Sequence, residues 1–467
     1  GSNPMTTTDL PRRLARRHAD LLVHGGTVLT PNGAERIDVA CLGGRIVALG
    51  ELRGTWRAET TLDATGLHVL PGVIDSQVHF REPGLTHKED LEAGTRGAVL
   101  GGVTAVFEMP NTDPLTLSAA DLQAKLDAAR GRAWCDHAFY IGGSAVNAEQ
   151  LATLENLPGC AGVKVFMGSS FGELLAEDDA VLRRILRHGR RRMAVHAEDE
   201  ARLRAHKAIV EVSGDVTQHP LWRDVESALL ATRRILRLAG ETGRRLHLLH
   251  VSTGEEIALL AGHKDRVSVE VTPHHLSLHA PDCYERLGSL AQMNPPVRER
   301  RHQDALWQGI RDGVVDVIGS DHAPHTLEEK ARPYPQSPSG MTGVQTLLPI
   351  MLDHVHAGRL SLQRLVDLTS AGPTRVFGLE GKGRIALGFD ADLSIVDLRA
   401  RRVIRNDWIA SVSGWTPYDG TTVTGWPIHT VVRGQVVVRD EALTEAPAQG
   451  RSLRFLEATP PGPSLDP

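Results

Sequence analysis

The stretch GVIDSQVHFREPG, residues 72–84, begins as an apolar run and becomes polar within a few positions. Its polar side chains include an acid, an amide, an imidazole and a guanidinium, at Asp75, Gln77, His79 and Arg81. Apolar runs rich in valine and isoleucine are typical of strands buried on both faces of a sheet. We therefore interpret the stretch as a buried strand that opens onto a chemically reactive loop.

Seven further runs of the same kind follow along the chain. They are GGVTAVFEMPN, CDHAFYIGG, GCAGVKVFMG, RRMAVHAEDE, RRLHLLHVST, RVSVEVTPHH and VVDVIGSDHAPH. Most intervals between them carry helical periodicity; residues 221–240, for example, carry an apolar stripe of Leu221, Val225, Leu229 and Leu236. Strand and helix alternating eight times predicts a (β/α)8 TIM barrel, and residues 71–325 match the roughly 250 residues typical of that fold.

The two ends of the chain have a different texture, with short β-rich segments punctuated by glycine turns. We predict a small β-sandwich domain built from both chain ends, residues 20–70 plus 380–440. The barrel then spans residues 71–379. Residues 1–19 are predicted to be a flexible N-terminus that begins with the remnant of a tag. Residues 441–467 are predicted to be a loosely ordered C-terminal tail, proline-rich at its end.

Composition narrows the function classes. The chain has 57 acidic and 52 basic residues, a formal net charge of −5, which gives no reason to expect nucleic acid or a membrane surface as partner. No apolar run approaches the length of a membrane span, and no signal peptide is recognisable. The four cysteines are widely spaced and form no Cys-x-x-Cys pair. A reduced, cytoplasmic enzyme is the natural interpretation.

Polar residues follow the ends of most of the predicted strands. Because the carboxyl ends of barrel strands converge on one pocket, we expect these side chains to meet there. The candidates are Gln77, His79, Asn111, Lys164, His196, His250, His274, His275, Asp321, His322 and His325.

The residue types suggest metal chemistry. His196 and His250 occupy equivalent ends of consecutive strands, and imidazole is a common zinc ligand. Lys164 lies in a buried strand, where it must be neutral, paired or chemically modified, for example as a carbamate that bridges two metals. Asp321 is either a helix cap or a metal ligand and proton shuttle. Arg81 is either a surface charge or a planar grip for an anionic substrate.

Several motifs resemble the dihydroorotases of the cyclic amidohydrolase superfamily, over about residues 20–440. GSDHAPHTLEEK (residues 319–330) matches one signature in full, and DSQVHFREP (residues 75–83) matches another except at Gln77. MPNT, VTPHH and NPPVR, which begin at Met109, Val271 and Asn294, are also similar to this family.

The resemblance implies roles for individual residues. It implies that His79 and Asp321 bind a first metal, that Lys164, as its carbamate, bridges to a second, and that His196 and His250 hold that second metal. Substrate-binding residues would be Arg81, Asn111, Asn294 and His325. It further implies Zn²⁺, one or two ions per subunit, a homodimer, and the reversible interconversion of L-dihydroorotate and N-carbamoyl-L-aspartate in pyrimidine synthesis.

Gln77 stands where the resemblance leads us to expect a histidine ligand, and three outcomes follow. Gln77 ligates through its amide oxygen, the site works with the second metal alone, or the site is inactive. The alternatives in function are an allantoinase or a hydantoinase/dihydropyrimidinase-type cyclic amidase, and a non-catalytic structural or regulatory relative.

Overall fold

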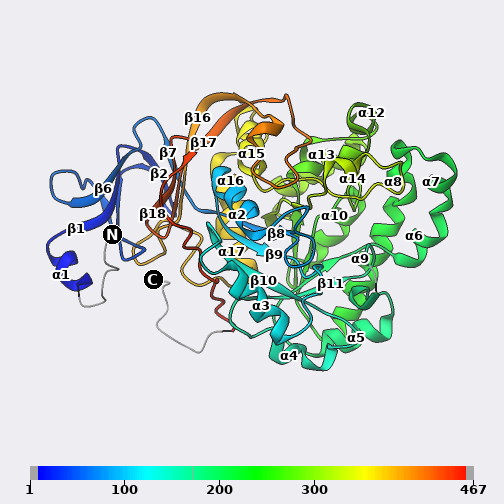
Figure 1. Cartoon of the computed structure of the whole chain (residues 1–467). Helices are drawn as coiled ribbons and strands as arrows, with labels where there is room; N and C mark the ends of the chain where they lie inside the picture. Colours follow the sequence, from blue (N-terminus) through cyan, green and yellow to red (C-terminus); the bar gives the residue numbers. More distant parts are fainter. Residues whose placement is uncertain (1–8, 171, 459–467) are drawn as a thin grey trace.

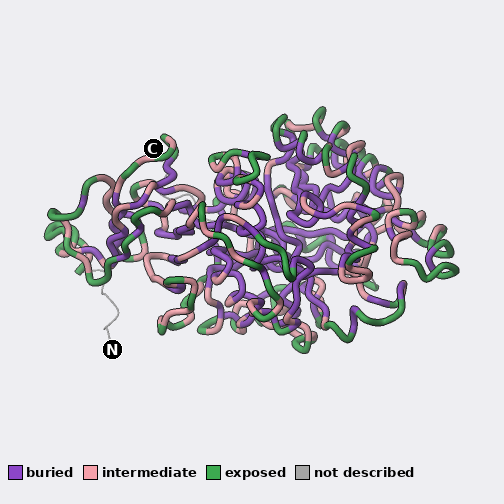
Figure 2. Tube along the Cα trace, turned by 90° about the horizontal axis from the view of Figure 1, so that it is seen from above, coloured by how far each residue is buried: buried purple, intermediate pink, exposed green. Residues whose placement is uncertain are grey.

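The structure, a computed structural model, describes residues 9–170 and 172–458 (Figures 1 and 2). Eight parallel strands follow one another around a single sheet in sequence order. They are β8 (Val73–Val78), β9 (Val103–Glu108), β10 (Asp136–Gly142), β11 (Cys160–Phe166), β12 (Met193–His196), β13 (Leu246–Leu248), β14 (Val267–Val271) and β15 (Val317–Ile318). The segment after β15 returns to β8 through a parallel bridge between Val78 and His322. The predicted TIM barrel is therefore confirmed.

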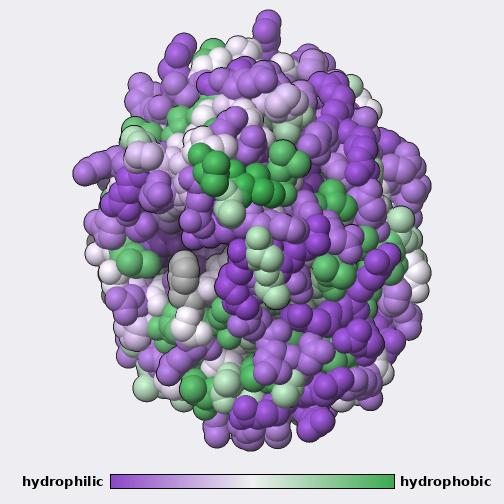
Figure 3. Space-filling view, turned by 90° about the vertical axis from the view of Figure 1, so that its right-hand side faces the viewer, coloured by the Kyte–Doolittle hydropathy of each residue, from purple (hydrophilic) through white to green (hydrophobic). Residues whose placement is uncertain are grey.

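All residues of these eight strands are buried, which explains why the runs are apolar on both faces. Figure 2 shows the same pattern as a buried centre surrounded by exposed helices and loops. The side of the barrel that faces away from the β-sandwich is largely hydrophilic, with scattered apolar groups (Figure 3). No helix within the described part of the chain is both long and apolar enough to span a membrane.

Helices fill the intervals between strands. They are α2 (Leu91–Leu100), α3 (Ala119–Ala129), α4 (Leu151–Leu154), α5 (Asp179–Arg187), α6 (Glu200–His206), α7 (Ala208–Ser213), α8 (His219–Trp222), α9 (Val225–Gly240), α10 (Gly254–Leu260), α11 (Pro273–Ser277), α12 (Asp282–Leu287), α13 (Arg300–Arg311), α14 (Leu327–Lys330), α15 (Leu347–His356), α16 (Leu362–Val366) and α17 (Gly372–Phe377).

One predicted helical stripe is wrong at its start. Asp224 caps α9 by accepting a hydrogen bond from Ser227 N, so the helix begins at Val225. Leu221 belongs to the separate α8 and is exposed. The buried face of α9 includes the predicted Leu229 together with Ala228, Ile235 and Leu238.

Two further sheets lie beside the barrel (Figure 1). One contains β1 (His18–His24), β4 (Asp38–Leu42), β5 (Arg45–Gly50) and β6 (Arg57–Asp63). The other contains β2 (Thr27–Thr30), β3 (Gly33–Arg36), β7 (His68–Pro71), β16 (Leu393–Val403), β17 (Thr422–Val432), β18 (Gln435–Arg439) and β19 (Ala442–Leu443). Leu21 and Ile46 of the first share one core with Val69 and Ile395 of the second. This is the predicted β-sandwich built from both chain ends; the residue limits of the domains stay predictions.

Both chain ends are more ordered than predicted. The N-terminal segment predicted to be flexible contains α1 (Leu10–Ala15), and β1 follows from His18. The tail packs on the barrel: Leu453 N donates to His137 O (2.8 Å), and Phe455 is buried against Phe107. The expectation of loose order is wrong for this part because its apolar side chains are buried. The predicted tag remnant and the last nine residues lie outside the described residues.

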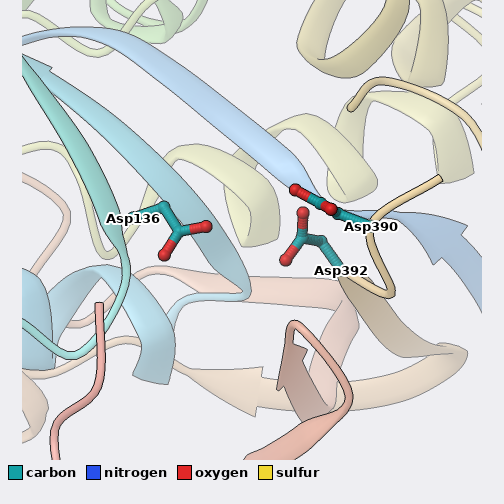
Figure 4. Close-up of side chains that lie close together, drawn as sticks. All are labelled: Asp136, Asp390 and Asp392. Atoms are coloured by element: carbon teal, nitrogen blue, oxygen red, sulfur yellow. The ribbon is translucent and has the colours of Figure 1, made fainter. Parts of the chain in front are cut away.

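A buried ion cluster joins the sandwich to the barrel. Asp136 begins β10, and Asp390 and Asp392 precede β16 (Figure 4). These carboxylates lie close enough together to suggest a metal site, but Lys382 Nζ already contacts all three, at 2.8, 3.0 and 2.6 Å. Although burial opposes it, the aspartates raise the pKa of Lys382, so the cluster is ion-paired within the chain.

We expect Lys382→Met to destabilise the protein by about 3–5 kcal/mol, because three carboxylates would lose the Lys382 ammonium, although Asp136 would keep its ion pair with Arg433. Arg183→Met is the matched control: it breaks an exposed ion pair with Glu241 and should destabilise the protein much less, because surface ion pairs contribute little. Urea unfolding followed by circular dichroism compares the two. Equal destabilisation would contradict the structural role of the cluster.

Candidate active site

Most of the candidate residues from the sequence lie at the carboxyl end of the barrel. Gln77 is in β8 and Lys164 in β11, and His196 ends β12. The others follow a strand within a few residues. Gln77, His79, Lys164, His196, His250 and Asp321 are all buried, whereas Asn111 is half-buried.

His79 and Asp321 form the first group. His79 Nε2 lies 3.1 Å from Asp321 Oδ1, and His79 Nδ1 lies 2.8 Å from Asn111 Oδ1. Burial lowers the pKa of His79 to about 4, so the ring is neutral at pH 7. With Nδ1–H donating to the amide oxygen, Nε2 presents a lone pair toward a carboxylate oxygen. Two acceptors that face each other are stabilised by a shared cation, so this pair fits a metal.

Gln77 contacts the same carboxylate. Its Nε2 donates to Asp321 Oδ1 (3.1 Å), and its Oε1 is buried without a hydrogen-bond partner among the described residues. An amide N–H has no lone pair to offer a metal. In this arrangement Gln77 holds Asp321 through a hydrogen bond and leaves only Oε1 as a potential ligand atom.

His196 and His250 form the second group, with their ring centroids 4.4 Å apart. His196 Nε2 lies 2.6 Å from Glu198 Oε1, which leaves Nδ1 as the available donor atom. The ring of His250 has no hydrogen-bond partner within the described chain, whereas its backbone N–H donates to Glu270 Oε1 (3.0 Å). Two imidazoles with free nitrogen atoms side by side are suitable metal ligands.

Lys164 is a fully buried amine with no carboxylate within 4.0 Å in the described structure. Its Nζ lies 3.5 Å from Met109 Sδ and 4.0 Å from the centroid of the Phe166 ring. Burial lowers the pKa of Lys164 to about 7, so a large fraction is the neutral amine at physiological pH. Only the neutral amine is nucleophilic.

Glu198 is a further residue of this site that was not predicted from the sequence. Arg223 donates to both of its carboxylate oxygens (2.9 Å each), and Ser169 Oγ also donates to it (2.8 Å). Despite burial, these partners hold the pKa of Glu198 well below its usual range. Carboxylates that hydrogen-bond the outer nitrogen of a ligand histidine fix its ring orientation. The His-x-Glu spacing in AVHAEDE was the available signal.

Arg81 lies beside the first group. Its Nε donates to Pro324 O (3.1 Å), and its Nη2 lies 3.3 Å from His325 Nε2. Only 6% of its surface is exposed, and no carboxylate of the described residues lies within 4.0 Å. Burial lowers its pKa to about 10, which still leaves it charged at neutral pH. A buried guanidinium without a counterion is a site for an anion.

The remaining candidates form hydrogen bonds with other protein groups, which at Asn294 involve the side-chain oxygen. Asn294 Oδ1 accepts from His219 Nε2 (3.0 Å). His274 bonds to Tyr418 and Thr342, His275 to Thr272 and Pro295, and His322 to Glu89 and Gly343. Both ring nitrogens of these three histidines are occupied by the protein, which makes them supporting residues.

The backbone is unusual at several positions in this region, Ser169 (φ 62°) among them. Arg81, His250 and Asp321 have positive φ values of 63°, 36° and 51°. Non-glycine residues in this conformation are held there by surrounding structure, and they cluster at functional sites. The strain supports the assignment of this end of the barrel as the active site.

Comparisons with known proteins identify the family of the chain. Residues 68–437 match the Amidohydrolase family. The dihydroorotase of Methanosarcina mazei is 35% identical over 451 residues, covering 93% of this chain and 97% of that protein. The allantoinase of Deinococcus radiodurans is 35% identical over 447 residues, covering 93% and 98%.

The chain is also similar to solved structures of cyclic amidohydrolases. The L-hydantoinase (dihydropyrimidinase) of Arthrobacter aurescens superposes with a TM-score of 0.89 at 30% identity, over 93% of this chain and 99% of that one. The relatives' names divide between three related activities, and the prediction of a cyclic amidohydrolase is confirmed. The chain belongs to the Amidohydrolase family and is a cyclic amidohydrolase.

Proposed function

We propose that this enzyme is a dihydroorotase, which interconverts L-dihydroorotate and N-carbamoyl-L-aspartate. The observation that carries the proposal is the buried Arg81 guanidinium, which has no counterion in the described structure. Dihydroorotate bears a carboxylate outside the reacting ring amide. Allantoin and hydantoin are neutral and would leave Arg81 unpaired, at a cost in binding. The predicted cytoplasmic location and homodimer stay predictions.

The donor atoms fit Zn²⁺, in one or two positions. His196 Nδ1, His250 and a carbamate of Lys164 would hold one ion, and His79 and Asp321 would hold another. The neutral amine of Lys164 would attack carbon dioxide, form the N–C bond and release one proton. Bound zinc activates water near neutral pH and polarises the amide carbonyl.

The chain's own groups supply orientation and proton transfer. Asp321 would accept a proton from the attacking water and deliver it to the ring nitrogen as the C–N bond breaks. Gln77 Nε2 donates to Asp321 Oδ1 and helps to fix the position of this carboxylate. Arg81, Asn111 and His325 would anchor the substrate carboxylate, and Asn294 the ring. Small errors in this alignment are costly in rate.

A substrate panel tests the proposal. Zinc-loaded enzyme should hydrolyse dihydroorotate with a kcat/KM at least about tenfold above those for allantoin, hydantoin and dihydrouracil, since a charge-assisted contact is worth about 1.5–3 kcal/mol. Equal or higher kcat/KM for a neutral amide would assign the enzyme to the allantoinase or hydantoinase class.

Arg81→Met should raise KM for dihydroorotate about ten- to a hundredfold, because it removes a charge-assisted contact. Steady-state kinetics also give the control: hydrolysis of any neutral amide turned over by the parent should change much less. An unchanged KM for dihydroorotate would remove Arg81 from the substrate site.

Asp321→Asn should abolish most turnover, by about 10²–10⁴-fold, because an amide cannot accept the transferred proton. The metal held by His196 and His250 should remain, as measured by elemental analysis. Activity within tenfold of the parent would exclude the proton-shuttle role.

Gln77→His should increase zinc occupancy at the His79–Asp321 position, because imidazole is a stronger zinc donor than an amide oxygen. Calorimetric titration of metal-free parent should show one tight and one weaker site, and the variant two tight sites. Two equally tight sites in the parent, with Gln77 coordinating fully, would contradict this.

A further inference from the structure

Lys88 lies in the loop after β8 and reaches the ring of His325. Its Nζ is 2.8 Å from His325 Nδ1 and 3.0 Å from Glu329 Oε2. Only 13% of the Lys88 side chain and 11% of the Glu329 side chain are exposed. Ser413 Oγ donates to Lys88 O (2.7 Å), which anchors the loop at this residue.

This contact determines where the imidazole carries its proton. An ammonium group only donates hydrogen bonds, so His325 Nδ1 must accept. The ring proton is therefore on Nε2, which donates to Ser339 O (2.9 Å). Arg81 Nη2, 3.3 Å from the same Nε2, is also a donor and finds no acceptor on the ring. Two donors from different segments thus lie together, and a carboxylate would accept from both.

The charges around His325 are cationic. Burial and the neighbouring Arg81, Lys88 and Lys330 hold the pKa of His325 well below its usual value, although the Ser339 carbonyl opposes this. Lys330 Nζ is satisfied by the carbonyls of Gln292 (3.1 Å) and Pro338 (2.8 Å).

Glu329 balances Lys88 within the chain. Despite burial, hydrogen bonds from Thr326 N and Lys88 lower the pKa of Glu329 to about 2, so it stays ionised. Because Glu329 neutralises Lys88, Arg81 is the cation beside His325 that a substrate carboxylate would neutralise.

We propose that Lys88 is a positioning residue that holds His325 in the neutral Nε2–H form, so that His325 and Arg81 donate to the same substrate carboxylate. The proposal rests on the dihydroorotase function for its kinetic consequence. Its structural consequence, the protonation state of His325, is measurable without turnover. Failure of the proposed dihydroorotase function is therefore distinguishable from failure of the proposed role of Lys88.

The first test is ¹⁵N-histidine NMR of the full-length protein, with the His325 signals assigned by His325→Gln. In the parent, Nδ1 should remain unprotonated from pH 8 to pH 6. In Lys88→Met, His325 should take up a proton at Nδ1 as pH falls, because Glu329 loses its cation and the ring loses a positive neighbour. Lys88→Arg should behave as the parent. Identical His325 signals in the parent and Lys88→Met would overturn the proposal.

The second test is the pH dependence of KM for dihydroorotate. Lys88→Met should raise KM about tenfold at pH 8, with kcat changed much less, and KM should fall toward the parental value near pH 6 as His325 becomes cationic. His87 also contacts Glu329 (3.4 Å) and is 59% exposed, so its titration is a competing cause. The pH dependence should persist in Lys88→Met combined with His87→Gln; its loss there would overturn the assignment to His325.

Two further outcomes also bear on the role of Lys88. If Lys88→Met does not fold, judged by its melting temperature, Lys88→Gln replaces it, since the amide keeps a donor and removes the charge. Lys88→Gln should still allow His325 to protonate at low pH, and no protonation would count against the proposal. If the parent does not turn over dihydroorotate, the proposed function fails, and the NMR result still decides the role of Lys88.

Discussion

The closure of the barrel between its first and last strands brings the active site together. His79 N donates to His322 O (2.7 Å), and Asp75 Oδ1 accepts from Ser320 N (3.0 Å). These bonds join segments more than 240 residues apart in the chain. They place His79 and Asp321 within 3.1 Å of each other, on backbone that is strained at Arg81 and Asp321. Without this closure, His79 would not lie beside Asp321, nor Arg81 beside His325.

Two pairs of buried cations differ in how their charge is balanced. Lys382 lies among aspartates at the amino-terminal end of the barrel, and Lys125 pairs with Glu108 (2.7 Å); both are neutralised within the chain. Lys164 and Arg81 have no carboxylate partner in the described structure and lie at the catalytic end. Burying an unpaired cation is costly, and backbone carbonyls of the kind that satisfy Lys330 are not recorded at Lys164 in the described part of the chain; a metal, a modification or a substrate is therefore a candidate source of the missing charge at Lys164 and Arg81.

The sequence predicts the barrel well because its strands are buried on both faces, and valine-rich runs such as that of β14 record this directly. The sequence mispredicts burial at positions where tertiary contacts, and not the local hydrophobic pattern, determine which side chains are buried. Leu221 fits the helical period of α9 but is exposed, because the Asp224 cap starts the helix later. Phe455 lies in a tail that resembles disordered sequence, yet it is buried on the barrel.

In the candidate active site, too, the sequence pattern identifies some residues, whereas others emerge only from tertiary contacts. Strand-end position indicates His79, His196, His250 and Asp321, but it also indicates His274 and His275, whose ring nitrogens are occupied by the protein. Lys88 is not predictable from local sequence, because its role depends on His325, which is 237 positions away in the chain. Gln77 is visible as a departure from a motif, whereas its hydrogen bond to Asp321 emerges only in three dimensions.

The central claim is that unpaired buried groups at the carboxyl end of the barrel hold a metal and a carboxylate-bearing cyclic amide. Crystals of the zinc-loaded enzyme soaked with L-dihydroorotate, measured at the zinc absorption edge, test it most directly. The account predicts an anomalous peak between His196 and His250, density for a carbamate beyond Lys164 Nζ, and the ligand carboxylate in contact with Arg81 and His325. A zinc peak confined to the Asp136–Asp390–Asp392 cluster, or a ligand carboxylate bound away from Arg81, would contradict it.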